Sequence, residues 1–475
     1  MQRVVSVLAY LACVGHGKRL QRPMEHLHKR LPLEAAKFPS LQSFAEANQL
    51  DGQGRLHPLE TVASFFFALN PLAAFNRNLV AALAPASATL ANRSPAPRGG
   101  PCMAVATVMP TDSGVKICDF TRKAIDGQNE EHDILLRAAR GEVTKRPPVW
   151  LMRQAGRYMA AFREYSEKYA FRQRSETPDM AVKLSLQPWH AFGTDGVIMF
   201  SDILTPLPAF GIEFDVVRGK GPVIKTPMDT AEDLAKVTLP KLEDFEEKMP
   251  FIQEILGSLR KETEGATTLL GFVGAPWTLA AYSMEGGGTK NALKSHKLMM
   301  HEPEAVEQFL RKLAEGIATY AAYQVSCGAQ VIQIFESWAH HISPETFEKF
   351  AKPYAKLCIE LIKKKCPDTP VIYFANGGSS YLELQTDMGS DMLCIDWGVD
   401  MEVAREIIGK EAGVSGNVDP RILFGTEEQI RKAVSACAAK AEGAPFVLNV
   451  GHGVMQGTPE ENVGIFVDQA RKSYY

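Results

Sequence analysis

The feature that most constrains this chain is a set of eight short apolar runs, rich in β-branched residues and separated by longer stretches with helical periodicity. Short apolar runs of this kind are typical of strands that are buried on both faces. They span residues 148–152, 196–200, 268–273, 330–335, 371–375, 392–396, 413–417 and 446–450. Parallel strands need a crossover between them, usually a helix. The pattern therefore predicts an α/β fold, a (β/α)8 TIM barrel with insertions, and an open doubly wound sheet is the alternative.

One of the intervening stretches shows the helical pattern clearly. Pro303 suits the first helical position, and apolar residues then recur three and four apart from Val306 to Ile317. Gly328 is expected to end this helix just before the next strand.

Charge, apolar runs and cysteine spacing exclude several classes of partner. The chain has 52 Lys and Arg residues against 55 Asp and Glu, a formal net charge of −3, so no general positive field would attract nucleic acid or an acidic membrane. No apolar run is long enough to span a bilayer. The eight cysteines are scattered, which predicts a reduced compartment and small buried side chains rather than disulfides or zinc ligands. Any bound anion must be held by local groups.

The N-terminal region differs from the rest. Residues 4–14 form a short apolar run behind Arg3, like the core of a signal peptide, and no Asp or Glu occurs between Thr61 and Thr111. Such tandem segments suit a plastid reached through the secretory route. We expect residues 1–108 to be a targeting presequence and residues 109–475 the mature barrel. The alternative is a disordered extension without a targeting role, which would leave the protein cytoplasmic.

Residues suited to one anionic ligand follow five of the predicted strands. They are Arg153 and Arg157 after the first run, Asp202 after the second, Tyr282 beyond the third, Ser337 after the fourth and His452 after the last. In a barrel these positions gather at one mouth. Arginines bind carboxylates, whereas an aspartate among them suggests a ligand that also carries N–H donors or develops positive charge. An anionic rim around an N–H centre describes a porphyrinogen.

Each of these residues also has a simpler interpretation. Arg153 and Arg157, four apart, could lie on a solvated helix face, and Asp202 could cap a helix. Tyr282 and His452 could belong to the core. The hypothesis of one shared site depends on their positions at independently placed strand ends.

Five strings resemble the uroporphyrinogen decarboxylase family from about residue 115 to the C-terminus, in the order found in that family. They are RQAGRYM, FSDILTPLPAFGIEF, GFVGAPWTLAAYSMEGG, FESWAHHISP and LNVGHGVMQGTPEENV. The resemblance implies a distorted (β/α)8 barrel, usually a homodimer with facing clefts, that needs no metal or organic cofactor. The activity it implies is that of a carboxy-lyase, which removes CO2 from the four acetate side chains of uroporphyrinogen III to give coproporphyrinogen III.

The resemblance also assigns roles to the candidate residues. The segment from Arg153 to Arg157 is expected to bind the substrate, with both arginines on its carboxylates. Asp202 is expected to accept hydrogen bonds from pyrrole N–H groups and to stabilise a cationic intermediate. The full set of substrate contacts is Arg153, Gln154, Ala155, Gly156, Arg157, Asp202, Tyr282, Ser337 and His452. The catalytic residues are expected to be Asp202, Arg153 and Tyr282, with Arg153 as the candidate proton donor. No metal ligand is expected.

Two other functions stay open. A zinc-dependent methyltransferase of the methylcobamide:coenzyme M type shares the expected fold, but it holds zinc through a His-x-Cys pair after a central strand, where this chain reads Tyr373-Phe374-Ala375-Asn376. A non-enzymatic tetrapyrrole carrier would bind the same ligand without releasing CO2.

Overall fold

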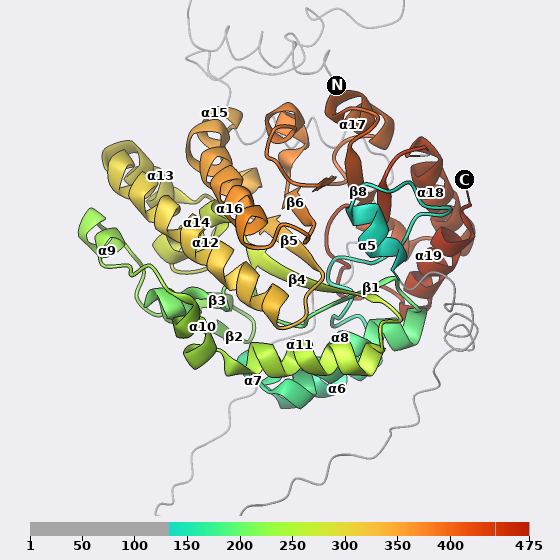
Figure 1. The fold of residues 1–475 in the computed structure, drawn as a ribbon, viewed down its shortest axis with the longest axis horizontal. Helices are drawn as coiled ribbons and strands as arrows, with labels where there is room; N and C mark the ends of the chain where they lie inside the picture. The colour runs from blue at the N-terminus through green and yellow to red at the C-terminus, as the bar shows by residue number, and fades with distance from the viewer. Residues whose placement is uncertain (1–132, 442, 475) are drawn as a thin grey trace, which may run out of the picture. The chain divides into compact units, whose positions relative to one another are not determined.

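A computed structural model describes residues 133–474 except residue 442. The expected presequence, residues 1–108, and the start of the mature barrel at residue 109 lie outside the described residues. Within the described part, a parallel sheet curls around the centre of the molecule (Figure 1). Its strands are, in spatial order, β1 (Gly196–Ile198), β4 (Thr268–Gly274), β5 (Val331–Glu336), β6 (Val371–Ala375), β7 (Met392–Cys394), β8 (Gly413–Val418) and β9 (Phe446–Val450).

The first predicted strand, residues 148–152, is not a regular strand. Val149 makes a single parallel bridge with Leu448 of β9, and its carbonyl accepts a hydrogen bond from the Asp195 backbone N–H at 2.8 Å, just before β1. Pro147 and Pro148 have no N–H to donate, which prevents a longer ladder. The expectation of a strand is therefore wrong here. The segment nevertheless joins β9 to β1, so the sheet closes as a distorted (β/α)8 barrel.

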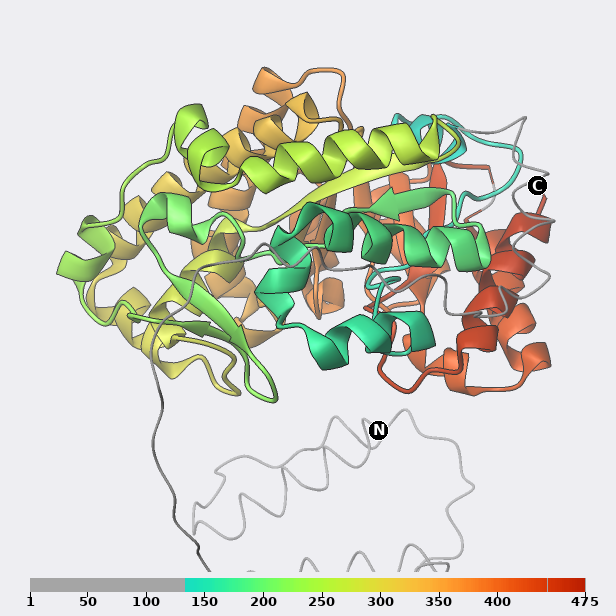
Figure 2. The ribbon, with the colours of Figure 1, turned by 90° about the horizontal axis from the view of Figure 1, so that it is seen from below.

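Helices surround the sheet. They are α5 (Ile134–Ala139), α6 (Ala160–Lys168), α7 (Phe171–Glu176), α8 (Pro178–Phe192), α9 (Ala231–Ala235), α10 (Leu242–Lys248), α11 (Pro250–Thr263), α12 (Pro276–Glu285), α13 (Leu293–His301), α14 (Pro303–Ser326), α15 (Pro344–Thr346), α16 (Lys352–Lys365), α17 (Met401–Ile408), α18 (Glu427–Lys440) and α19 (Glu460–Lys472). An antiparallel hairpin, β2 (Phe214–Val217) and β3 (Gly221–Ile224), is inserted after β1. Figure 2 shows the helices that cover the β1–β4 side of the sheet.

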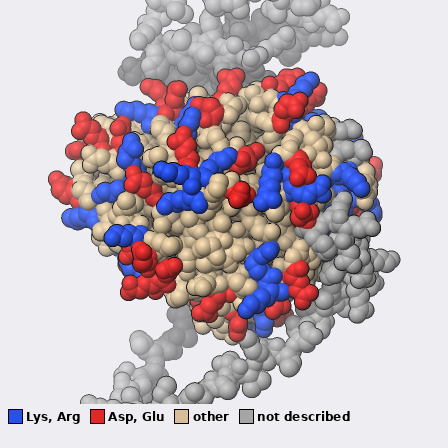
Figure 3. All heavy atoms as spheres, in the orientation of Figure 1, with Lys and Arg blue, Asp and Glu red and all other residues tan. Residues whose placement is uncertain are grey.

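Helix α14 confirms the helical pattern in the sequence. It begins at Pro303 and ends at Ser326, and Gly328 beyond it has a φ of +125°, a conformation that favours glycine. None of the helices in the described part is long and apolar enough to cross a membrane. Lys and Arg side chains alternate with Asp and Glu on the face shown in Figure 3, so no single sign of charge dominates that face.

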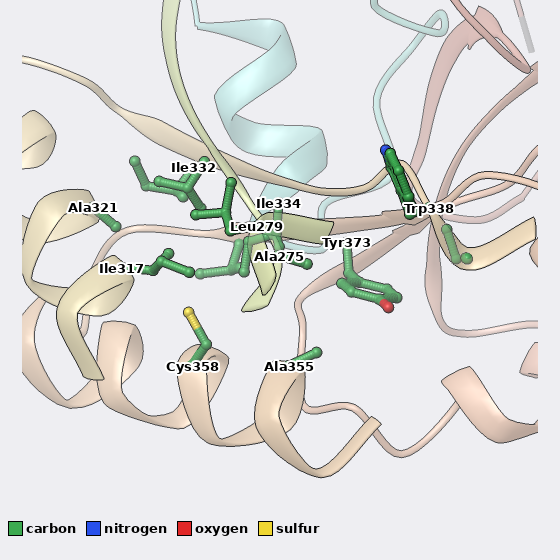
Figure 4. Packing of buried hydrophobic residues seen from close by; sticks show 14 of the residues in the cluster. Ala275, Leu279, Ile317, Ala321, Ile332, Ile334, Trp338, Ala355, Cys358 and Tyr373 are labelled. Atoms are coloured by element: carbon green, nitrogen blue, oxygen red, sulfur yellow. The ribbon is translucent and has the colours of Figure 1, made fainter. Parts of the chain in front are cut away.

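Two apolar layers form the core, because successive strand residues point to opposite faces. Leu270, Phe272 and Phe374 belong to the cluster inside the barrel, with Trp150 from the bridging segment. Ile332 and Ile334 of β5 belong to the cluster between the sheet and the helices (Figure 4). The carboxyl ends of the strands, where the candidate residues follow, rest on this core.

Candidate active site

Residues 148–152 form the segment that bridges β9 and β1, and Gln154 anchors the loop that follows it. Its side chain is fully buried, its Nε2 donates to the Gly196 carbonyl of β1 at 3.0 Å, and its Oε1 accepts from Leu151 N–H at 3.3 Å. The Tyr158 hydroxyl donates to the Gln154 carbonyl at 2.6 Å. Since both ends of the Gln154 amide are bonded within the protein, this residue positions the loop rather than reaching the mouth. The direction in which the Gln154 side chain points, towards Gly196, could not be predicted from the sequence.

Arg153 lies at the start of this loop with an exposed side chain and a φ of +60°, which is uncommon for a residue with a Cβ. Its side chain passes directly over Gly453, where an added Cβ would overlap Arg153 Cδ and lie 2.7 Å from Cγ. The Val454 N–H donates to the Met152 carbonyl at 2.8 Å and holds the two loops together. The first and last loops of the barrel therefore meet at Arg153.

Asp202 follows β1 and is partly buried. Its Oδ1 accepts a hydrogen bond from the Leu204 backbone N–H at 2.8 Å, within a turn. The short helix that follows, Leu207–Phe210, has Pro206 at its N-cap, so the interpretation of Asp202 as a helix cap is wrong. Among the described residues no donor reaches Oδ2. Burial raises the pKa of Asp202, while the Leu204 N–H and the charge of Arg153 oppose that rise. One carboxylate oxygen is thus available to a ligand.

Tyr282 comes from helix α12 and packs on Trp338, which follows β5; their ring centroids lie 4.7 Å apart. Burial raises the pKa of Tyr282, and a hydrogen bond from the Trp338 side chain partly offsets it. The charges of Asp202 and Arg153 both act on this hydroxyl. Tyr282 is therefore a neutral hydroxyl beside the carboxylate and the guanidinium.

His452 completes this group. Burial, followed by the charges of Arg153 and His340, lowers the pKa of His452 to about 4, and its ring is stacked against Phe374 at 6.4 Å. Its Nδ1 is buried and has no hydrogen-bond partner in the described part of the chain. The ring is thus neutral near pH 7. The structure brings Arg153, Asp202, Tyr282 and His452 together, as the sequence predicted.

The other candidate residues have different surroundings. Ser337 is partly buried and directly precedes Trp338, so it borders the same group. Arg157 is exposed, and Ala155 and Gly156 are partly buried in the turn between the two arginines. All three lie in the loop that Gln154 anchors.

The sequence model of the uroporphyrinogen decarboxylase family, described as "Uroporphyrinogen decarboxylase (URO-D)", matches residues 130–473. The chain belongs to this family. A uroporphyrinogen decarboxylase of Synechocystis sp. is 50% identical over 339 residues, which cover 71% of this chain and 96% of that protein. One of Trichodesmium erythraeum is 51% identical over 339 residues, 71% of this chain and 95% of the relative. A solved methyltransferase from Methanosarcina mazei has a TM-score of 0.61 at 21% identity, covers 71% and 97% of the two chains, and shows the fold alone.

In this family member, polar residues that the sequence hypothesis omitted also lie near the mouth. Asn376, after β6, donates from Nδ2 to the Ser337 carbonyl at 3.1 Å and lies 3.0 Å from His340 Nδ1. Asp396, after β7, is buried, bonded to Ser379, and its charge raises the pKa of His452. The rule that selected Asp202, a polar residue within a few positions of a strand end, would have found Asn376 and Asp396 as well.

A further arginine lies beside Arg157. Arg174 of α7 is buried, with its guanidinium 5.3 to 5.7 Å from the ring centres of Phe162, Phe171 and Phe200. Burial, and then the charge of Arg157, lowers the pKa of Arg174 to about 10. Its charge adds to the positive potential on the Arg157 side of the decarboxylase mouth. Its position on a helix gave no signal in the sequence.

Proposed function

We propose that this chain is a uroporphyrinogen decarboxylase, which converts the four acetate side chains of uroporphyrinogen III to methyl groups and releases coproporphyrinogen III. The observation that carries the proposal is the partly buried Asp202 carboxylate, which has one oxygen without a protein donor and lies near Arg153. A macrocycle with carboxylates at its rim and N–H groups at its centre complements this arrangement.

In the bound state, Arg153 and Arg157 hold carboxylates at the rim. Asp202 accepts hydrogen bonds from the pyrrole N–H groups, which compensates for the cost of burying its charge. Tyr282, Ser337 and His452 supply neutral polar groups around the same ring. The segment from Gln154 to Gly156 keeps the two arginines in place.

The reaction needs a place for the electrons of the broken carbon–carbon bond. Protonation of a pyrrole carbon creates a cation that takes up this electron pair as CO2 leaves. A second proton then converts the exocyclic methylene to a methyl group, and the ring loses the first, so each CO2 released consumes one proton. Asp202 stabilises the cation electrostatically in a site shielded from water. Arg153 is the proposed donor; a water or a substrate carboxylate is the alternative.

One assay tests this function. Purified protein is incubated anaerobically with uroporphyrinogen III in metal-free buffer, and the products are separated by carboxylate number. We expect seven-, six- and five-carboxyl intermediates followed by coproporphyrinogen. A tetrapyrrole carrier would bind the substrate and leave all eight carboxylates in place, which would contradict the proposal.

The zinc methyltransferase alternative is less well supported by the residues at the mouth. After β6 stand Asn376 and Gly377, neither of which is a preferred zinc ligand. Zinc analysis of the purified protein provides the test. A stoichiometric zinc ion whose removal abolishes turnover would favour the methyltransferase.

We also propose that the protein is a homodimer. Three large apolar side chains are exposed on neighbouring loops at the mouth: Trp397 after β7 (45% exposed), Phe424 after β8 (49%) and Met455 after β9 (43%). Clustered apolar side chains of this size are typical of interaction surfaces. Sedimentation equilibrium should give twice the chain mass, and Phe424→Asp should shift the protein towards monomer. A monomeric wild type would contradict the proposal.

The targeting role of residues 1–108 is a separate proposal, supported by the acid-poor stretch that precedes Thr111. A fluorescent protein fused after residue 108 should enter plastids. A diffuse cytoplasmic signal would favour an extension without a targeting role.

A further inference from the structure

Glu336 is a buried carboxyl that lies behind the mouth rather than in it. It is the last residue of β5 and is fully buried. Phe335 belongs to the cluster inside the barrel. Ile332 and Ile334 belong to the outer cluster (Figure 4). By the alternation of a strand, Glu336 shares the outward direction of Ile332 and Ile334. Its carboxyl therefore faces the helices and does not touch a ligand in the barrel mouth.

Thr278 joins this carboxyl to the loop that follows β5. The Thr278 hydroxyl donates to Glu336 Oε1 and accepts a hydrogen bond from the Trp338 backbone N–H at 3.2 Å. The indole N–H of Trp277, the neighbour of Thr278, donates to the Trp338 carbonyl at 3.4 Å. Both backbone polar groups of Trp338 are thus tied to the start of α12.

The same helix carries Tyr282 one turn after Thr278. Tyr282 packs on the Trp338 ring, and the charges of Asp202 and Arg153 act on its hydroxyl. A short path of contacts therefore leads from Glu336 through Thr278 and Trp338 to the group of residues at the mouth.

The surroundings of Glu336 favour the uncharged form of its carboxyl. Burial raises the pKa of Glu336 to about 8, against the effect of the Thr278 hydrogen bond. The charge of Glu336 acts on three titratable groups of the described chain: Tyr373 of β6, Cys358 of α16, and Tyr381 in the segment after β6. Burial raises the pKa of all three. No cation among them would favour an ionised carboxyl. Near pH 7 the cluster is uncharged, and the Thr278 hydroxyl donates to Glu336 Oε1 while it accepts from the Trp338 N–H, which fixes the loop geometry.

We propose that Glu336 is a positioning residue of the decarboxylation site, which acts through Thr278 to set where Trp338 and Tyr282 stand beside Asp202. This inference rests on the proposed function of the mouth residues. It concerns the rate of the chemical step rather than the binding of substrate, because the arginines that hold the rim carboxylates lie on the loop after residue 152.

A matched pair of substitutions at Thr278 tests the proposal. Thr278→Val keeps the shape of the side chain and removes its hydroxyl, whereas Thr278→Ser keeps the hydroxyl. We expect Thr278→Val to lower kcat by about tenfold with KM changed less than about threefold, because a small misplacement of a catalytic group costs rate. Thr278→Ser should keep at least half of the wild-type kcat. Equal kcat values for the two variants would overturn the inference.

A second pair addresses the carboxyl itself. The Glu336→Gln side chain still accepts a hydrogen bond from Thr278 and should restore most of the kcat lost in Glu336→Leu. Because both residues act along one path, Thr278→Val combined with Glu336→Leu should be no slower than the slower single variant. Rate losses that multiply in the double variant would contradict a shared path.

Gln324 provides the control for stability. This fully buried residue of α14 bonds both the N–H and the carbonyl of Phe272 in β4, at 2.9 and 2.8 Å, away from the mouth. Gln324→Leu should lower the melting temperature without lowering kcat of the folded protein. A kcat loss equal to that of Thr278→Val would mean that destabilisation alone explains the effect. An active wild type in the same assay separates failure of this inference from failure of the proposed function.

Discussion

At the scale of single residues, burial decides which groups at the mouth carry charge. It raises the pKa of Tyr282 and lowers that of His452 to about 4, so both are neutral at pH 7. Burial also raises the pKa of Asp202, but the Leu204 N–H and the charge of Arg153 oppose that rise and favour the carboxylate, which lies near the Arg153 guanidinium as its opposite charge. Such an arrangement can bind the carboxylates at the rim of a ligand and stabilise positive charge that develops at its centre.

Arg153 should contribute to substrate binding in addition to its proposed role as proton donor. Arg153→Ala is expected to weaken the binding of uroporphyrinogen III by about 1.5 to 3 kcal/mol, roughly 10- to 150-fold in Kd, because charged hydrogen bonds are lost. Equilibrium binding measured anaerobically provides the test. Arg137→Ala, on α5 at the opposite end of the barrel, is the control. An unchanged affinity in Arg153→Ala would remove this residue from the site.

Glu336 should make the protein less stable as the pH rises. In the unfolded chain a Glu loses its proton near its ordinary pKa of 4.5, whereas the folded protein holds it until about pH 8. The folded state therefore binds the extra proton between these values, and its stability falls as the pH increases across this window. Glu336→Gln lacks this proton, so its melting temperature relative to wild type should rise by roughly 2 °C or more from pH 5 to pH 8. A constant difference would show that Glu336 is ionised in the folded protein.

At the scale of elements, the sequence predicted the positions of the strands well because they are buried on both faces. The runs at residues 371–375 and 446–450 coincide with β6 and β9. Residues 148–152 fail as a strand because the prolines before Val149 limit the ladder to one bridge. Hydrophobic periodicity indicates which residues are buried, but it does not indicate which backbone groups form hydrogen bonds.

The candidate site was predictable to the extent that it depends on strand ends. Asp202 and His452 follow strands, Arg153 follows the segment that bridges β9 and β1, and the three meet as expected. The roles of Gln154 and Glu336 were hidden, because they depend on the direction in which a buried side chain points and on partners far away in the chain, such as Gly196 and Thr278.

The contact between the first and last loops depends on a residue without a Cβ. Gly453→Ala would place a methyl group where Arg153 Cγ and Cδ lie, and so would displace the guanidinium. We expect kcat/KM to fall by roughly tenfold while the melting temperature changes little, because the Arg153 side chain is exposed. Gly464→Ala in α19, whose Cβ would meet Phe192 at an ordinary 3.6 Å, should keep full activity. Equal activity of the two variants would contradict the close approach of Arg153.

At the scale of the whole molecule, the barrel should need nothing from residues 1–108. The family match begins at residue 130, beyond the expected boundary at residue 108. A protein of residues 109–475 should therefore fold and decarboxylate with kcat within about twofold of the full chain, since all the mouth residues and their supporting helices remain. Circular dichroism and the anaerobic assay provide the measurement. Loss of folding or activity would show that residues before 109 belong to the enzyme.

The charge of Asp202 is expected to stabilise a cation that exists only during the reaction. Asp202→Asn keeps the size of the side chain and removes its charge. Measured side by side, anaerobic affinity for uroporphyrinogen III should change by less than about threefold, while kcat should fall by about 100-fold or more. Loss of affinity and of kcat by the same factor would contradict the account, because Asp202 would then only position the substrate.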